Sequence, residues 1–237
     1  TNISDDFGHA VKELSEILNI KGQVIPSTNS SVRLNAVMTD GEVVCGESEI
    51  PKKNKRIERV FLEPEDVQPM EEAVEALKEA DLIVLGPGSL YTSVISNFCV
   101  KGIADAVVQS DAPKLYVANI MTQSGETNDY TAYDHVNALH RHVNQSFVDY
   151  VICNTQDFDE VVLERYKQRN GIPSEPDQAR LEAAGIEVVS HPDLIQITPE
   201  YYVRHNTDVL AKMIYEIALK ETSTIEFERN KGKNKRR

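Results

Sequence analysis

Glycine and hydroxyl residues that directly follow a short apolar run could hold a phosphate group. The apolar run 82–85 stops at Gly86-Pro87-Gly88, and polar, helix-compatible sequence follows. A buried parallel strand that ends in a glycine turn leaves backbone N–H groups free at its carboxyl end, and a helix that begins there adds partial positive charge. We therefore expect a phosphorylated or nucleotide ligand at the turn. Its candidate binding residues are Gly86, Gly88, Ser89, Leu90, Tyr91 and Thr92.

The glycine turn by itself also fits a strand-to-helix connection without any ligand. The hydroxyls of Ser89, Tyr91 and Thr92 favour binding, because they add hydrogen-bonding groups beside the turn. The spacing is neither a P-loop nor a dinucleotide fingerprint, since no Lys follows the glycines and no third Gly completes G-x-G-x-x-G.

A second polar loop follows the next expected strand, residues 115–118. Loops after parallel strands open at the same edge of a sheet, so this loop should lie beside the glycine turn. Glu126 could accept hydrogen bonds from sugar hydroxyls or act as a base, and it could equally be an acid at the start of a helix. Gln123 could instead satisfy loop backbone. The candidate residues of this loop are Asn119, Thr122, Gln123, Gly125, Glu126 and Thr127.

Alternating helical and extended patterns predict an α/β fold. A helix is expected over 6–18, and the Asp40-Gly41 turn between two extended runs predicts an antiparallel hairpin, appended to the main sheet. After Pro69 helical and extended segments alternate, which predicts a mostly parallel sheet with helices on both faces. Helices are expected at 71–80, 100–109, 132–143, 159–167, 179–184 and 209–219, and strands at 82–85, 115–118, 150–153 and 186–189.

The charge of the chain argues against nucleic acid as a partner. The net charge is −13, and removing the six positive charges among the last nine residues would take it to −19. An acidic body of this kind repels nucleic acid and anionic membranes. The basic end could contact either, but such runs are more often solvated and disordered. No apolar run approaches the roughly 20 residues of a membrane span.

The cysteines and histidines show no metal-binding or disulfide pattern. The three cysteines are widely spaced, with no C-x-x-C pair and no Cys/His spacing that matches zinc. His135, His140 and His142 occur in one expected helix but do not share one face well. We therefore expect no metal ion and a reducing, cytoplasmic setting.

Residues 86–93 and 119–127 are the stretches with the most specific pattern, and residues 2–3, 6–9 and 203–207 add to it. Together they resemble the YvcK family, the bacterial gluconeogenesis factors within the superfamily of the 2-phospho-L-lactate transferase CofD. The resemblance runs from Thr1 to about Phe227. It implies a three-layer α/β/α Rossmann-like fold in a cytoplasmic protein.

The resemblance also implies a function. The family binds nucleotide sugars of the UDP type and supports cell shape and growth on gluconeogenic carbon. The transferase relatives instead move a phospholactyl group from a guanosine diphosphate carrier to a deazaflavin, and a glycine-turn phosphate site fits both roles. Neither loop carries Lys or Arg to stabilise charge on a pyrophosphate, which favours a binding factor over a phosphotransferase.

The chain departs from the family pattern in three places. Ser96 and Ser124 stand where the family usually has Pro. The family's first strand, its Gly-Gly-Gly-Thr-Gly turn and an Asn-Gly-Gly-Ser segment do not occur here, so we expect the N-terminal βα units to be missing. We expect one α/β domain over 1–227 and a disordered basic tail over 228–237.

Two kinds of protein partner stay open from the sequence. The first is a second copy of the chain, in a homo-oligomer. The second is a regulatory kinase, which could phosphorylate a hydroxyl cluster expected just after the last helix, at Thr222, Ser223 or Thr224.

Overall fold

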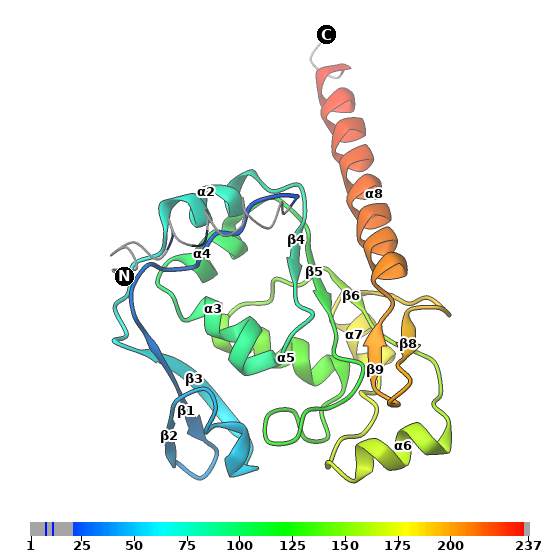
Figure 1. Ribbon diagram of the computed structural model, residues 1–237. Helices are drawn as coiled ribbons and strands as arrows, with labels where there is room; N and C mark the ends of the chain where they lie inside the picture. The colour runs from blue at the N-terminus through cyan, green and yellow to red at the C-terminus, as the bar shows by residue number, and fades with distance from the viewer. Residues whose placement is uncertain (1–7, 9–10, 12–20, 235–237) are drawn as a thin grey trace.

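The structure is a computed structural model that describes Gly8, Val11 and residues 21–234, with side chains of the last helix described as far as Ser223. Most of the helix expected over 6–18, the motif residues 2–3 and the chain end 235–237 lie outside the described residues. The described chain forms a four-stranded sheet, with a three-stranded and a two-stranded sheet beside it (Figure 1).

The four-stranded sheet is parallel throughout, which confirms the α/β prediction. Its strands lie in the order β4-β5-β6-β7, so strands that are consecutive in the chain are neighbours in space. The loops that follow β4 and β5 therefore leave the same edge of the sheet, side by side. The bounds are β4 Ile83–Leu85, β5 Lys114–Val117, β6 Tyr150–Ile152 and β7 Glu187–Val189.

Helices cover both faces of this sheet, because successive side chains of each strand point to opposite faces. On β5, Tyr116 faces the larger core, to which helix α5 (Ala132–Val143) contributes. Leu115 and Val117 face the other way, in a core shared with helix α8 (Thr207–Asn234). The remaining helices are η1 Pro51–Lys53, α2 Glu71–Glu79, η2 Leu90–Ile95, α3 Ser96–Phe98, α4 Ile103–Gln109, α6 Glu160–Lys167 and α7 Gln178–Ala183.

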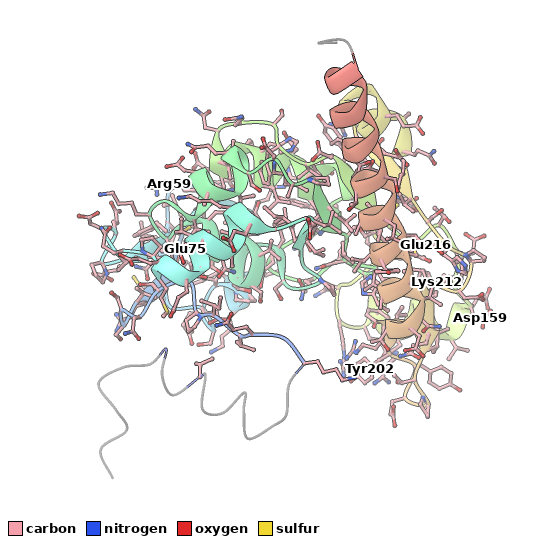
Figure 2. All side chains as sticks on the ribbon, turned by 90° about the horizontal axis from the view of Figure 1, so that it is seen from above. Arg59, Glu75, Asp159, Tyr202, Lys212 and Glu216 are labelled. Carbon is pink, nitrogen blue, oxygen red and sulfur yellow. The ribbon has the colours of Figure 1, made fainter. Side chains whose placement is uncertain are left out.

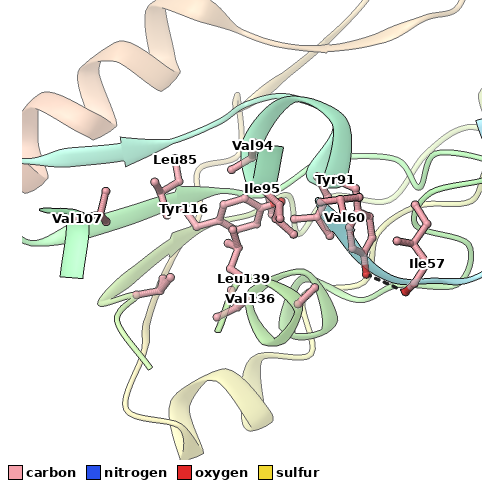
Figure 3. Close-up of a cluster of buried hydrophobic side chains, with 14 of the residues drawn as sticks. Ile57, Val60, Leu85, Tyr91, Val94, Ile95, Val107, Tyr116, Val136 and Leu139 are labelled. Carbon is pink, nitrogen blue, oxygen red and sulfur yellow. Dashed lines mark hydrogen bonds between the residues drawn. The ribbon is translucent and has the colours of Figure 1, made fainter. Parts of the chain in front are cut away.

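The antiparallel sheet formed before Pro69 confirms the expected appended hairpin. Strands β1 (Arg33–Met38), β2 (Val43–Cys45) and β3 (Ile57–Glu63) pair in the order β2-β1-β3. Ile57 and Val60 of β3 belong to the same core as Tyr91 and Ile95 of η2 (Figure 3). The Tyr91 hydroxyl lies 3.5 Å from the Ile57 carbonyl oxygen, so this sheet is tied to the segment that carries the glycine turn.

Two segments differ from the expected pattern. The helix expected over 100–109 begins only at Ile103, because Gly102 takes a left-handed conformation with φ of +82°. Residues 90–98 are helical instead, as η2 and α3. A short hairpin of β8 (Ile195–Ile197) and β9 (Val203–His205) was not expected, because its strands are only three residues long.

The last helix is longer than expected. It ends at Asn234 rather than near Leu219, so residues 228–234 are helical where disorder was expected. Their Lys, Arg and Glu residues favour helix and no Pro interrupts them, whereas Asn230, Gly232 and Asn234 disfavour it. Thr222 and Ser223 lie within this helix rather than after it, and their hydroxyls donate to the carbonyls of Ala218 and Leu219. The division into one domain and a tail stays a prediction, as does phosphorylation.

No helix in the described part of the chain is both long enough and apolar enough to cross a membrane.

Candidate functional site

The glycine turn after β4 depends on glycine at its first position. Gly86 has φ of +85°, and a β-carbon there would lie 3.2 Å from the carbonyl oxygen of Val117 on β5. A side chain would therefore strain the backbone and press against the neighbouring strand. Gly88 is less constrained because its φ is not positive, although its added β-carbon would still lie 3.3 Å from the β-carbon of Ser93. The peptide bond between Gly86 and Pro87 is cis.

The turn and the second loop meet through a chain of side-chain hydrogen bonds. The Asn119 amide donates to Gln123 Oε1 at 3.0 Å, and Gln123 Nε2 donates to Ser89 Oγ at 2.9 Å. The three side chains are half-buried. The structure thus brings together the two loops that the sequence placed at one edge of the sheet.

The direction of these hydrogen bonds leaves the hydroxyl proton of Ser89 available. A serine hydroxyl has one donor and two acceptor positions. Ser89 Oγ accepts from Gln123, and within the described residues no hydrogen bond uses its hydroxyl as a donor. Nor do the described hydrogen bonds use the amides of Gly88 and Ser89 as donors. These three groups are suited to a phosphate oxygen.

The Glu126 carboxylate lies at the start of helix η2, which follows the glycine turn. Its side chain is buried, with 5% exposure. Glu126 Oε1 accepts from the Thr92 hydroxyl at 2.9 Å, and Oε2 accepts from the Tyr91 amide at 3.3 Å. The sequence left open whether Glu126 meets a sugar or starts a helix. The structure shows a carboxylate that caps η2 across 35 residues of chain.

This cap changes which amides remain for a ligand. Burial raises the pKa of the Glu126 carboxyl, while hydrogen bonds from the Thr92 hydroxyl and from the Tyr91 and Thr92 amides oppose that rise. The amide groups at the helix start, which the sequence assigned to a phosphate, are therefore directed at the protein's own carboxylate. A ligand phosphate would use the turn itself, at Gly88 and Ser89.

The other predicted residues have structural contacts. The side chains of Leu90 and Tyr91 are fully buried in the core. Thr122 exchanges hydrogen bonds with the backbone of Ile172. Thr127 Oγ1 accepts from the backbone N–H of Gln123 at 2.9 Å. Leu90 and Tyr91 therefore pack in the core, and Thr122 and Thr127 hold the loop in shape.

Gly125 is required by the close approach of the antiparallel sheet. Its φ is +82°, and an added β-carbon would lie 1.9 Å from the Pro51 carbonyl oxygen. Beside it, the Asn128 amide donates to Asn54 Oδ1 at 2.9 Å. The loop is therefore fastened to the connection between β2 and β3, which a local reading of the loop could not show.

A cavity of about 630 Å³ adjoins the glycine turn on the β4 side. Its lining includes Gly86, Gly88, Ser93 and Asn97, and most of the rest is apolar. The volume is in the range of small-molecule sites. The 119–127 loop does not line this cavity; Gln123 of that loop instead donates to Ser89, the residue after Gly88.

The sequence did not assign to the site several groups on α6 and β9. His205 on β9 has a buried Nε2 atom without a hydrogen-bond partner among the described residues, and burial lowers its pKa. Arg165 lies in α6 and Arg169 lies two residues after its end, and their spacing of four residues could have drawn attention to them. Over the described residues, no group of three or more His, Cys, Asp or Glu side chains could hold a metal ion.

Comparisons with known proteins agree with this architecture. The sequence profile of the family described as 2-phospho-L-lactate transferase CofD matches residues 1–194. The gluconeogenesis factor of Bacillus subtilis is 44% identical over 93% of this chain and 69% of its own length. That of Listeria monocytogenes is 39% identical over 94% of this chain and 68% of its own.

A solved structure shows the same fold. The crystal structure of a Bacillus halodurans protein, described as a member of the UPF0052 family, superposes with a TM-score of 0.86 at 40% identity. The match covers 91% of this chain and 69% of that one. With the profile match over most of its length, the chain belongs to the CofD family, among the YvcK-type gluconeogenesis factors.

Proposed function

We propose that this protein is a nucleotide-sugar-binding factor whose ligand diphosphate contacts the turn at Gly88 and Ser89. The observation that carries the proposal is the hydrogen bond from Gln123 to Ser89, which leaves the Ser89 hydroxyl proton and two turn amides for an anion. The adjoining cavity of about 630 Å³ has room for the sugar or the nucleoside. A UDP-sugar is the ligand that the family resemblance favours.

Calorimetry on the full chain tests this proposal. We expect UDP-N-acetylglucosamine or UDP-glucose to bind more tightly than GDP, and we expect Ser89→Ala to weaken binding by about tenfold, since a hydrogen bond to a charged group is lost. Ser223→Ala, which removes a hydroxyl from α8, serves as the matched control. Undiminished binding to Gly88→Val and Ser89→Ala proteins that remain folded would place the ligand elsewhere.

The role in the cell is part of the same proposal. Relatives named gluconeogenesis factors support a function in growth on gluconeogenic carbon, and we extend it to cell shape. A Bacillus subtilis strain without its own factor would test both. Expression of this chain should restore growth and shape, and the Ser89→Ala protein should do so less well.

Phosphotransfer is the second candidate, because the matching family profile is described as a transferase. Its substrates would be a guanosine-linked phospholactyl donor and a deazaflavin acceptor. Turnover in an assay that contains both would replace the binding-factor proposal with this one.

A further inference from the structure

A second cavity, of about 580 Å³, lies between the segment that leads into β1 and the helices η2 and α3 (Figure 1). It is lined by residues 26–32 on one side, by residues of η2 and α3 on the other, and by Glu47 after β2. Ser27 and Asn97 line both this cavity and the one beside the glycine turn, so the two cavities meet at this pair. The volume is again in the range of small-molecule sites.

The hydroxyl groups that line this cavity donate their protons to the protein itself. Thr92 donates to Glu126 Oε1 at 2.9 Å, and Ser96 donates to the Thr92 carbonyl oxygen at 2.9 Å. Ser27 likewise donates to Asn97 Oδ1. A hydroxyl oxygen has two acceptor positions, and no hydrogen bond between the described residues uses those of Ser27, Thr92 or Ser96. These three side chains therefore offer a ligand lone pairs rather than protons.

A carboxylate gives the cavity a negative charge. Glu47 is exposed, and none of the ion pairs formed by the described residues includes it. Burial is the main cause of the raised pKa of Glu126, and the charge of Glu47 adds to it, so the two carboxyl groups are close enough to interact. Of the described residues that line the cavity, none is Lys, Arg or His. The lining therefore favours a cation over an anion.

Apolar side chains supply part of the wall. Leu34 of β1, Leu62 of β3 and Val100 are buried and line the cavity. Such side chains pack against the C–H groups of a ligand, while the oxygens around them accept its N–H and O–H donors. A phosphate or carboxylate would bring further acceptors and negative charge to this wall, and its desolvation would not be compensated.

From this arrangement we propose that the cavity binds a small hydroxylated amine, whose ammonium group meets Glu47 and whose hydroxyl groups donate to Ser27, Thr92 and Ser96. The site is separate from the glycine turn and does not depend on the ligand proposed there. A neutral sugar would leave Glu47 without a cation, and a metal ion would leave the apolar wall uncovered. The lining therefore favours an organic ammonium compound over both.

Calorimetric titration of the full chain with D-glucosamine and with D-glucose, at an ionic strength of about 0.15 M, tests this site. The two sugars differ in one group, an ammonium in place of a hydroxyl, and we expect glucosamine to bind about tenfold more tightly. Glu47→Gln should lower glucosamine affinity about tenfold and remove its preference over glucose, because the ammonium group loses its carboxylate. Glu75→Gln removes the same charge from an exposed position on α2 and is the matched control (Figure 2).

Two further variants locate the bound sugar. Ser96→Ala removes one accepting oxygen, and we expect the affinity for both sugars to fall about threefold. Ser89→Ala should leave both affinities unchanged, because Ser89 belongs to the glycine turn, and this result distinguishes the amine site from the proposed nucleotide-sugar site.

Three results would overturn the proposal. The first is equal affinity of the unaltered protein for glucosamine and glucose. The second is an equal loss of glucosamine affinity from Glu47→Gln and Glu75→Gln, which would show only general attraction to an acidic protein. The third is displacement of glucosamine by an equimolar amount of Ca²⁺, which would identify a metal site instead.

Discussion

The carbonyl oxygen of Pro51 lies so close to Gly125 that a β-carbon on Gly125 would fall 1.9 Å from it. The contact fastens the antiparallel sheet to the loop that carries Asn119, Gln123 and Glu126. The shape of the candidate site therefore depends on a part of the chain that contributes no candidate ligand group.

Replacement of Gly125 by alanine should destabilise the protein strongly. The new side chain would meet both a positive φ and the Pro51 carbonyl, and we expect a loss of about 3 kcal/mol or more in the free energy of unfolding. Urea denaturation measures this. Gly185→Ala is the control, since Gly185 has φ of +79° but open space around it, and it should lose only about 1 kcal/mol. Equal losses in the two variants would show that Pro51 does not press on Gly125.

Glu126 should behave as a helix cap in stability measurements. Glu126→Ala leaves the Tyr91 amide without its buried acceptor, and we expect a loss of about 1 to 3 kcal/mol in the free energy of unfolding. Glu126→Gln should cost less, because its oxygen can accept from Tyr91 while its amide donates to the Thr92 hydroxyl. If the two variants unfolded at the same urea concentration, the cap would contribute little.

Ligand binding should depend on pH through Glu126. Burial raises the pKa of this carboxyl, and a phosphate bound at the turn would raise it further. Binding should therefore take up protons, and affinity should increase as pH falls through the pKa of Glu126 in the complex and level off below its pKa in the free protein. Calorimetry in buffers with different ionisation enthalpies detects the proton uptake. The Glu126→Gln protein should show none of it, and an unchanged uptake there would assign the proton to another group.

Ser89 and Gln123 should act as one unit in binding. Gln123→Ala removes the donor that orients the Ser89 hydroxyl, so we expect a UDP-sugar affinity about as low as that of Ser89→Ala. Because the two side chains share one hydrogen bond, the double variant should be little worse than either single variant. Calorimetric titration of all four proteins completes the cycle. Additive losses would mean that the two side chains meet the ligand independently.

The histidines of α5 should make the fold sensitive to acid. His142 donates from Nδ1 to the Ala138 carbonyl and accepts from the Val60 amide at Nε2, which requires the neutral ring. Burial lowers the pKa of His142 below 6.5, and it also lowers those of His135 and His140. A lowered pKa means that the unfolded chain binds more protons than the folded one near the unfolded pKa.

The stability that these neutral rings contribute is complete above about pH 6.5 and is lost as pH falls toward the folded pKa values. Urea unfolding at several pH values between about 7.5 and 5 should show a falling free energy of unfolding. The slope gives the number of protons taken up on unfolding. A flat profile would mean that the three rings are charged, or free to charge, in the folded protein.

Local patterns in the sequence determined most of the fold. Helix α5 was predicted at its observed bounds, 132–143, from the helical spacing of its apolar residues, and the structure adds a capping box of Thr131 and Asp134 at its start. The alternation of helix and strand after Pro69 likewise determined that the sheet is parallel, and hence that the turn at Gly86 and the loop at Asn119 share an edge. Such signals are readable because their partners are close in the chain.

Only the tertiary structure decided what the groups at that edge do. Glu126 meets Tyr91 across 35 residues, and Tyr202 meets Arg165 across a similar span, so neither pairing has a local signal. The sequence shows only that Gly125 lets the loop backbone bend. A glycine is required there because Pro51, in the connection between β2 and β3 some seventy residues earlier, packs against it. Residue types established which chemistry was available, and long-range packing established which of those groups the protein uses for itself and which it leaves for a ligand.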